Sequence, residues 1–286
     1  MDISTSSLLQ PVDDGLPMRD SGEWAKDKCD ILARYIDTST YAIKDKPWRR
    51  RFYIDLQAGP GKNRCPNGEV FLGSPLLALT KGAGFTDYRF VEKDEAFANA
   101  LLKRCEASAQ QQSVQIIVGD CNEVANQIAN EVEQIDQPPF SKTDWNSLCL
   151  VFLDPEGLEL EWRTVARIAS LRRADLIINF STGGLRRSAP GAIALPPDET
   201  AVDRFFGTLD WRSIPRNSDG SMPAHEWIEF YRERLTGLGY RWGTSIRVKN
   251  SKNVELYRLL FASKHDLGIK LWEDARKNAP TQRALF

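Results

Sequence analysis

The chain has 286 residues, of which 42% are hydrophobic and 27% charged, with a formal net charge of −1. These values suit a globular protein with a substantial core, and they exclude a chain whose overall charge attracts nucleic acid or membranes. No apolar run is long enough to span a membrane, and no signal-peptide pattern is present. The five cysteines are scattered and odd in number, which indicates reduced thiols. We therefore expect a cytoplasmic protein without a membrane partner.

The first third of the chain contains a helical pattern followed by a strand and a glycine turn. Residues 1–21 lack periodicity and predict a mobile N-terminal tail, with a single α/β domain over 22–286. Helical spacing of apolar residues predicts a helix over 23–41. The segment 52–61, FYIDLQAGPG, predicts a buried strand that ends near an acid and enters a tight turn. Small residues in this turn would let a ligand lie directly on the main chain.

Three later segments repeat the pattern of an apolar strand followed by an acid. They are YRFVEKD at 88–94, VQIIVGD at 114–120 and LCLVFLDPEG at 148–157, with helical patterns at 95–106 and 122–132 between them. Alternating strands and helices predict a parallel sheet with helices on both faces. Because ligands bind just past the carboxyl ends of such strands, four acids in series predict a binding rim.

The rest of the chain completes this pattern. Residues 62–72 are expected to be irregular, and Ser74 is expected to be the N-cap of a helix whose first residue is Pro75. Further expected elements are a helix at 162–171, a strand at 174–180, a short helix at 201–206, a helix at 224–238, and an antiparallel hairpin of 240–248 and 254–263. Residues 181–223 are rich in Gly, Pro, Ser and Arg and predict an irregular insertion.

Strand–helix units closed by an antiparallel hairpin resemble the class I S-adenosylmethionine-dependent methyltransferase fold. This Rossmann-like α/β fold has a mostly parallel seven-stranded sheet of order 3-2-1-4-5-7-6. A closer resemblance, over about residues 23–275, is to the three-Cys-motif partner protein family (TcmP). It rests on YIDLQAGPGKNR, GSPLLAL, FVEKD, GDCNE, FLDPEGLELEW, DLIINFS and RVKN…LYRLLFASK. The family name implies a partner protein that carries the cysteine motif.

The resemblance implies a site for S-adenosylmethionine on the acids and the glycine turn. The implied cofactor-binding residues are Asp55, Ala58, Gly59, Gly61, Glu92, Asp120 and Asn122. In the methyltransferase pattern the turn holds the methionine end and ribose edge, and an acid such as Glu92 accepts hydrogen bonds from both ribose hydroxyls. Asp120 matches the position that receives the adenine amino group. Asn122 either assists or caps the next helix.

The segment from Asp154 to Gly157 is the predicted chemical site. Enzymes that methylate exocyclic amines of bases carry Asp or Asn, two prolines and an aromatic ring at this place. Here Asp154 and Pro155 are kept, with Asp154 expected to orient an acceptor amine and Glu156 to take up its proton. The stacking ring is missing, and Trp162 or Phe180 could replace it. Nucleic acid is the leading acceptor by this analogy.

Residues after the fifth strand are predicted to contact the substrate. Asn179 and Phe180 are expected at the same rim, and Arg186 and Arg187 could bind a substrate phosphate because the arginine fork suits it. The alternative for the two arginines is a solvated loop. No metal site is expected.

The same residues also bear on other functions. A P-loop would need glycine in place of Leu56 and Ser or Thr in place of Asn63, so it is excluded. A dinucleotide site is disfavoured by Arg64 at the third glycine position. A non-catalytic cofactor-binding or scaffold module acting through its partner stays open. So does a nuclease in which the acids hold Mg²⁺.

Overall fold

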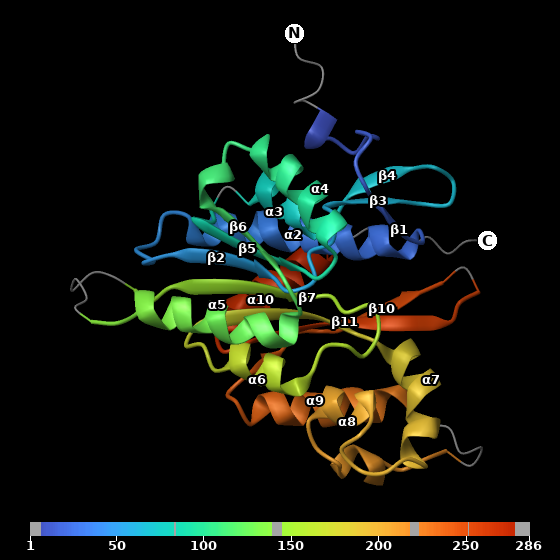
Figure 1. The fold of residues 1–286 in the computed structure, drawn as a ribbon. Helices are drawn as coiled ribbons and strands as arrows, with labels where there is room; N and C mark the ends of the chain where they lie inside the picture. The colour runs from blue at the N-terminus through green and yellow to red at the C-terminus, as the bar shows by residue number, and fades with distance from the viewer. Residues whose placement is uncertain (1–6, 83, 139–144, 218–222, 251, 278–286) are drawn as a thin grey trace.

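The computed structural model describes residues 7–82, 84–138, 145–217, 223–250 and 252–277, and its centre is one mixed sheet (Figure 1). The strand order is β10-β11-β8-β7-β2-β5-β6, with β9 also paired to β11. The strands are β2 (Arg51–Asp55), β5 (Asp87–Glu92), β6 (Val114–Val118), β7 (Leu148–Leu153), β8 (Ala174–Phe180), β9 (Arg241–Trp242), β10 (Ile246–Lys249) and β11 (Glu255–Ser263).

This sheet confirms the predicted class I methyltransferase fold. The strands β6, β5, β2, β7 and β8 run parallel, whereas β11 is antiparallel to β8 and β10 is antiparallel to β11. Taken in chain order, and with the short β9 left aside, the arrangement is 3-2-1-4-5-7-6. The count differs from the expectation only by β9, which makes the sheet eight-stranded.

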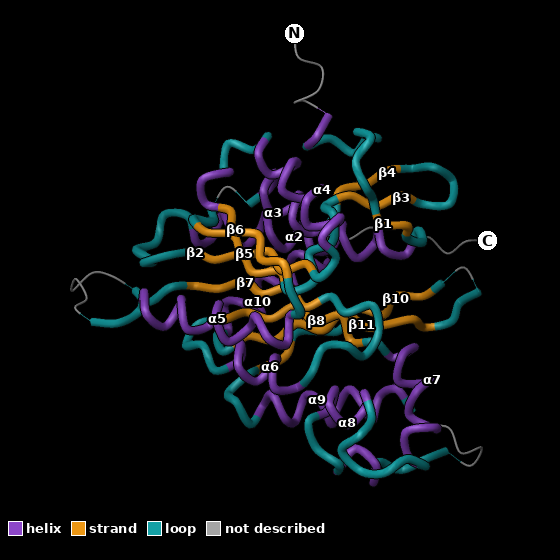
Figure 2. Tube along the Cα trace, in the orientation of Figure 1, coloured by secondary structure: helices purple, strands orange, loops and turns teal. Residues whose placement is uncertain are grey.

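Helices cover both faces of the sheet, as Figure 2 shows. One face packs on α2 (Trp24–Ile43), α3 (Ser74–Lys81), α4 (Glu95–Glu106) and α10 (Asp266–Lys277); the other packs on α5 (Cys121–Ile135), α6 (Trp162–Ala169), α8 (Ala201–Phe206) and α9 (Ala224–Thr236). Because side chains alternate between faces along a strand, Tyr53 joins the first core and its neighbours Phe52 and Ile54 join the second.

The N-terminal residues differ from the predicted mobile tail. Residues 7–21 lie against the domain, and β1 (Arg19–Asp20) pairs in parallel with β3 (Lys62–Arg64). The Asp14 carboxylate forms ion pairs of 2.7 Å with both Lys62 and Arg104. The tail was predicted from composition alone, which cannot reveal a buried ion pair between distant residues.

Two segments predicted as irregular contain regular structure. Residues 62–72 include β3 and β4 (Val70–Leu72), which form an antiparallel pair. The insertion at 181–223 contains α7 (Thr182–Ile193), α8 and the 3₁₀ helix η2 (Asp210–Ser213). Local caps explain these helices: the Ser181 hydroxyl accepts a hydrogen bond from the Gly184 amide, and Thr200 forms a capping box with Asp203. Residues 218–222 of the insertion lie outside the described residues.

Two sequence expectations concern cysteines and membranes. All five cysteines are buried free thiols. No helix in the described part of the chain combines the length and the apolar character needed to cross a bilayer.

Candidate functional site

The four predicted acids lie at the carboxyl ends of neighbouring strands. In register, Asp55 at the end of β2 pairs with Phe90 and Phe152, and Glu92 ends β5. Asp154 follows β7 directly, and Asp120 follows β6. Their surroundings differ: Asp55 is fully buried, whereas the Asp120 side chain is 41% exposed. The rim therefore has a buried half near β2 and an open half near β6.

The glycine turn is tied to the neighbouring strand. The Ala58 amide donates to the Val91 carbonyl at 2.8 Å, and the Gly59 amide donates to Oε2 of Glu92 at 2.7 Å. Gly59 and Gly61 have φ of 65° and 87°, a region that favours glycine. A Cβ on Gly61 would lie 3.0 Å from Leu76 and Leu101, so this glycine serves packing. Gly59 faces the site instead.

Glu92 holds the turn and keeps capacity for a ligand. Its Oε1 accepts from the Asp94 amide at 2.8 Å, and its Oε2 accepts from Gly59. Each carboxylate oxygen has two lone pairs, so one remains on Oε1 for a hydroxyl donor, whereas Oε2 also lies 3.5 Å from Nη2 of Arg19. A carboxylate oxygen that can still accept a hydrogen bond suits the predicted contact with the ribose hydroxyls.

The site contains buried acceptor atoms that have no partner. Oδ2 of Asp55 and Oδ1 of Asn179 are both buried without a hydrogen bond to any described residue. Burial raises the pKa of Asp55 to about 7, against the opposing effects of the Ser74 hydroxyl and of the Gln57 amide, which donates to Oδ1. Buried polar atoms normally find partners, so two orphaned acceptors indicate a missing donor.

Asp154 is held by residues from three elements. The Lys28 ammonium on α2 lies 2.7 and 2.5 Å from its two carboxylate oxygens, and Nδ2 of Asn179 donates to Oδ1 at 2.7 Å. The Asp154 amide donates to the Gln57 side chain at 3.1 Å. Lys28 also lies 5.5 Å from the ring centre of Tyr257. No sequence motif singles out Lys28, which is one of several charged residues in its helix.

A second cation, Arg19, also reaches the rim from the N-terminal segment. Its Nη1 lies 2.7 Å from Oε1 of Glu156, and its Nη2 lies 3.5 Å from Oε2 of Glu92. Its guanidinium carbon lies 5.6 Å from the ring centre of Phe97 and 3.5 Å from where a Cβ on Gly59 would be. Arg19 is absent from the predicted site because residues 1–21 were expected to form a mobile tail.

Asp120 and Asn122 stand at the open half of the rim. Asp120 caps α5 by accepting from the Asn122 amide. The Asn122 side chain donates to the Glu159 carbonyl and accepts from the Glu161 amide and the Thr164 hydroxyl. The structure thus gives Asn122 a role in ordering the loop after β7, while Asp120 forms the helix cap.

A cleft of about 460 Å³ begins at these two residues. Its walls are the loop after β7 and helices α7 and α8, and its lining includes Asp120, Asn122, Gly157, Glu161, Arg187 and Arg204. Arg187 therefore lines the same cleft as Asp120 and Asn122. Arg186 instead donates to the Glu255 carbonyl at 3.3 Å.

The predicted substrate contact of Phe180 is wrong. Phe180 is fully buried and packs on Phe205 and Tyr231, with ring centres 5.3 and 5.2 Å away. Trp162 packs on Tyr231 in the same core, at 5.1 Å. The cause is strand alternation: Asn179 faces Asp154, so the next side chain points to the opposite face. Neither ring can stack on a substrate at the rim.

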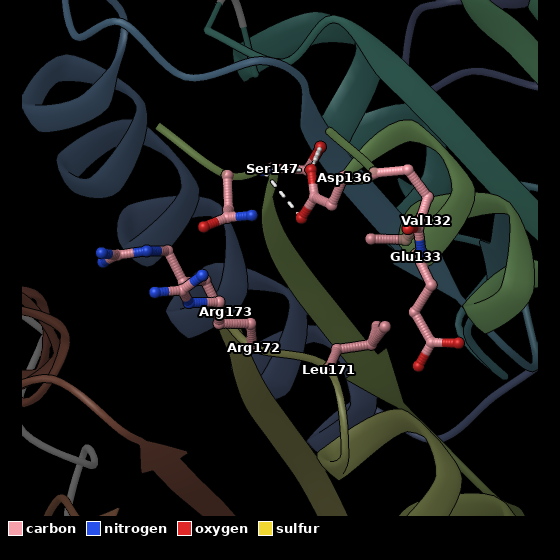
Figure 3. A pocket seen from close by; sticks show the side chains of 9 residues that line it. Val132, Glu133, Asp136, Ser147, Leu171, Arg172 and Arg173 are labelled. Carbon is pink, nitrogen blue, oxygen red and sulfur yellow. Dashed lines mark hydrogen bonds between the residues drawn. The ribbon is translucent and has the colours of Figure 1, made fainter. Parts of the chain in front are cut away.

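A smaller pocket of about 210 Å³ lies away from the rim (Figure 3). Figure 3 shows Asp136 and Ser147 on one side and Arg172 and Arg173 on the other. Asp136 accepts from the Ser147 amide and hydroxyl, both at 2.8 Å. None of the predicted site residues lines this pocket.

The nuclease alternative requires acids that are placed to hold a metal ion. Within the described residues, no group of three His, Cys, Asp or Glu side chains is placed to hold a metal ion. Asp154, Glu156 and Asp120 are instead paired with Lys28, Arg19 and Lys93 respectively. This arrangement disfavours the nuclease alternative.

Comparisons with known proteins identify a fold. No family model and no curated protein matches the chain. The chain is similar to protein LPL1258 from Legionella pneumophila, with 12% identity, a TM-score of 0.50, and coverage of 90% of this chain and 92% of that one. This similarity shows a shared fold and nothing about activity.

Two further solved structures are O-methyltransferases. One, from Bacillus cereus in complex with SAH, is 14% identical with a TM-score of 0.45 and covers 92% of each chain. The other is TomG from Streptomyces achromogenes in complex with SAM, at 15% identity, a TM-score of 0.44, and coverage of 93% of this chain and 91% of that one. These lower TM-scores support no conclusion about this chain.

Proposed function

We propose that the chain binds S-adenosylmethionine at the carboxyl ends of β2, β5 and β6 and transfers its methyl group to an amine. The observation that carries this is the pair of orphaned buried acceptors: Asp55 Oδ2 at the end of β2, where the glycine turn begins, and Asn179 Oδ1 in β8, beside Asp154. An ammonium group supplies several donors and a positive charge, and the amino-acid end of this cofactor has one. A neutral, apolar ligand would leave both acceptors unsatisfied.

The other groups of the cofactor also find suitable partners. Glu92 keeps a lone pair on Oε1 for a ribose hydroxyl, and Gly59 presents main chain without a side chain beside the Arg19 guanidinium. Asp120 borders a cleft that is open to a planar adenine group. The cofactor supplies an electrophilic methyl group on its sulfonium, and the protein supplies alignment.

Asp154 is proposed to orient the acceptor amine. Lys28 and Asn179 fix the position of its carboxylate, which keeps an unused lone pair on Oδ2. Glu156 is 70% exposed and would pass the acceptor's proton to solvent. Nucleic acid remains the leading acceptor class, supported by the Asp-Pro resemblance and by Arg187 and Arg204 in the cleft.

The resemblance to the TcmP family extends the proposal to a partner and a compartment. By this resemblance, the chain acts in the cytoplasm together with a three-Cys-motif protein. A partner would also supply what the rim lacks, because Phe180 and Trp162 cannot stack on a base.

A scaffold role is the second candidate, and one observation favours it. Three cations of the chain itself already pair with the acids of the site: Lys28 with Asp154, Arg19 with Glu92 and Glu156, and Lys93 with Asp120. A module that binds a cofactor without catalysis would keep such pairs permanently.

Calorimetry with S-adenosylhomocysteine, followed by transfer assays with labelled S-adenosylmethionine on DNA, RNA and the partner, separates the two candidates. The methyltransferase predicts binding, transfer, and loss of transfer by roughly 10²–10⁴-fold in Asp154→Ala with binding kept. Glu229→Ala, an exposed residue of α9, is the control and should transfer normally. Binding without transfer supports the scaffold, and absence of binding refutes both.

A further inference from the structure

The amino-acid end of the proposed cofactor carries a carboxylate as well as an ammonium. Asp55 and Asn179 account for the ammonium through their acceptor oxygens, and acceptor oxygens cannot bind a carboxylate. An anion in a half-buried site needs a cation or several amide donors, since burying an unpaired charge is costly. The binding site is therefore incomplete without a positive partner near the turn.

Two cations reach this part of the rim, and they differ in how far they are satisfied. The Lys28 ammonium contacts both oxygens of Asp154 and is 12% exposed. Removing it would leave Asp154 without its ion pair. Arg19 is less committed: its Nη2 is 3.5 Å from Glu92, and its Nε is buried with no hydrogen-bond partner among the described residues.

The strongest contact of Arg19 is also its most replaceable one. Nη1 pairs with Glu156, whose side chain is 70% exposed, and such solvated pairs contribute little. Losing this partner therefore costs little, and a ligand carboxylate that binds the Nε–Nη2 edge would satisfy Nε. The planar guanidinium is suited to this contact because it can offer two parallel N–H groups to one carboxylate.

The position of Arg19 is fixed by the fold. Its backbone belongs to β1, which pairs with β3, and the preceding segment is anchored through Asp14. The guanidinium lies against the turn, 3.5 Å from where a Gly59 side chain would begin. A Cβ at Gly59 would lie at ordinary van der Waals distance from Arg19, so the bare turn and the arginine are direct neighbours.

We propose that Arg19 is a cofactor-binding residue that recognises the carboxylate of the amino-acid end, with Asp55 and Asn179 recognising its ammonium. This inference rests on the proposed function and adds a residue from the N-terminal segment to it. It also explains why β1 and the β3–β4 pair are present: they carry Arg19 to the glycine turn.

The test compares two ligands that differ only in the amino-acid end. S-adenosylhomocysteine carries the carboxylate and ammonium, whereas 5′-methylthioadenosine keeps the adenosine and sulfur alone. In calorimetry, Arg19→Ala should weaken S-adenosylhomocysteine roughly 10–100-fold, as expected for a charge-assisted hydrogen bond, and leave 5′-methylthioadenosine unchanged. Arg19→Lys should recover part of the loss. Arg64→Ala, on the neighbouring β3, is the matched control and should bind both ligands normally.

The outcomes separate this inference from the proposed function. If the wild-type protein binds neither ligand, the cofactor proposal itself is wrong. Equal weakening for both ligands would show that Arg19 acts only through the fold. Tighter binding in Arg19→Ala would show that the arginine blocks the site rather than serving it. Either of these last two results overturns the inference while leaving a cofactor site in place.

Discussion

Two clusters of charged side chains meet the N-terminal segment, and they differ in how completely their atoms are paired. In the first, Asp14 binds Lys62 and Arg104, and all three side chains are at most 1% exposed. Arg104 also donates to the carbonyls of Pro17 and Pro60. In the second, at the rim, Arg19 and Asp55 each keep a buried atom without a partner. Closed networks of this kind stabilise a fold, whereas open ones are available to a ligand.

The closed cluster should respond most strongly to mutation. Asp14→Asn leaves two buried cations without a counter-charge, and we expect the free energy of unfolding to fall by about 3–5 kcal/mol. Urea denaturation at pH 7 measures this. A loss below about 1 kcal/mol would mean that the N-terminal segment contributes no such network, and the comparison of the two clusters would fail.

The open cluster should respond in the opposite direction. Burial raises the pKa of Asp55 to about 7, so the folded state binds its proton more tightly than the unfolded state does. Stability from this group is therefore lost as pH rises from about 4 to 7. Asp55→Asn should stabilise the protein at pH 8 by roughly 2–4 kcal/mol and weaken S-adenosylhomocysteine binding at least tenfold. A destabilised variant that binds normally would show that Asp55 is a structural acid.

The pH dependence of the closed cluster gives a smaller effect. Burial alone would raise the pKa of Asp14, but hydrogen bonds from Arg104 and Lys62 outweigh it and lower that pKa to about 2. The stabilisation is present above about pH 4 and is lost as pH falls towards 2. The difference in unfolding free energy between wild type and Asp14→Asn should shrink by about 2 kcal/mol over that range. A difference that stays constant would assign the mutant's defect to packing instead of charge.

The sequence predicted the open cluster only in part. Each acid follows an apolar run, and because both faces of a central parallel strand are buried, such runs identify both the sheet and its rim. Arg19 and Lys28 are single cations with no motif, brought to the rim by elements far from it in sequence. Phe180 was misassigned because the end of a strand contributes one side chain to each face.

The closed cluster was missed altogether, for a related reason. Asp14, Lys62 and Arg104 lie in a loop, a short strand and a helix, and their pairing depends on where the chain folds back. Composition describes the N-terminal residues as tail-like, and periodicity does not apply to a segment with a two-residue strand. Tertiary ion pairs leave no local signal in one sequence.

The smallest expected effect tests whether the closed cluster is important because its side chains are buried or only because it lies on the N-terminal segment. Asp13 is the neighbour of Asp14 and pairs with Arg64 of β3, but these side chains are 58% and 42% exposed. Asp13→Asn should change the free energy of unfolding by less than about 1 kcal/mol, because solvent and salt screen exposed pairs. Denaturation in low and high salt checks this, with Asp14→Asn measured alongside. A loss comparable to that of Asp14→Asn would show that any charge on the N-terminal segment anchors it, so that the buried network has no special role in holding Arg19 at the rim.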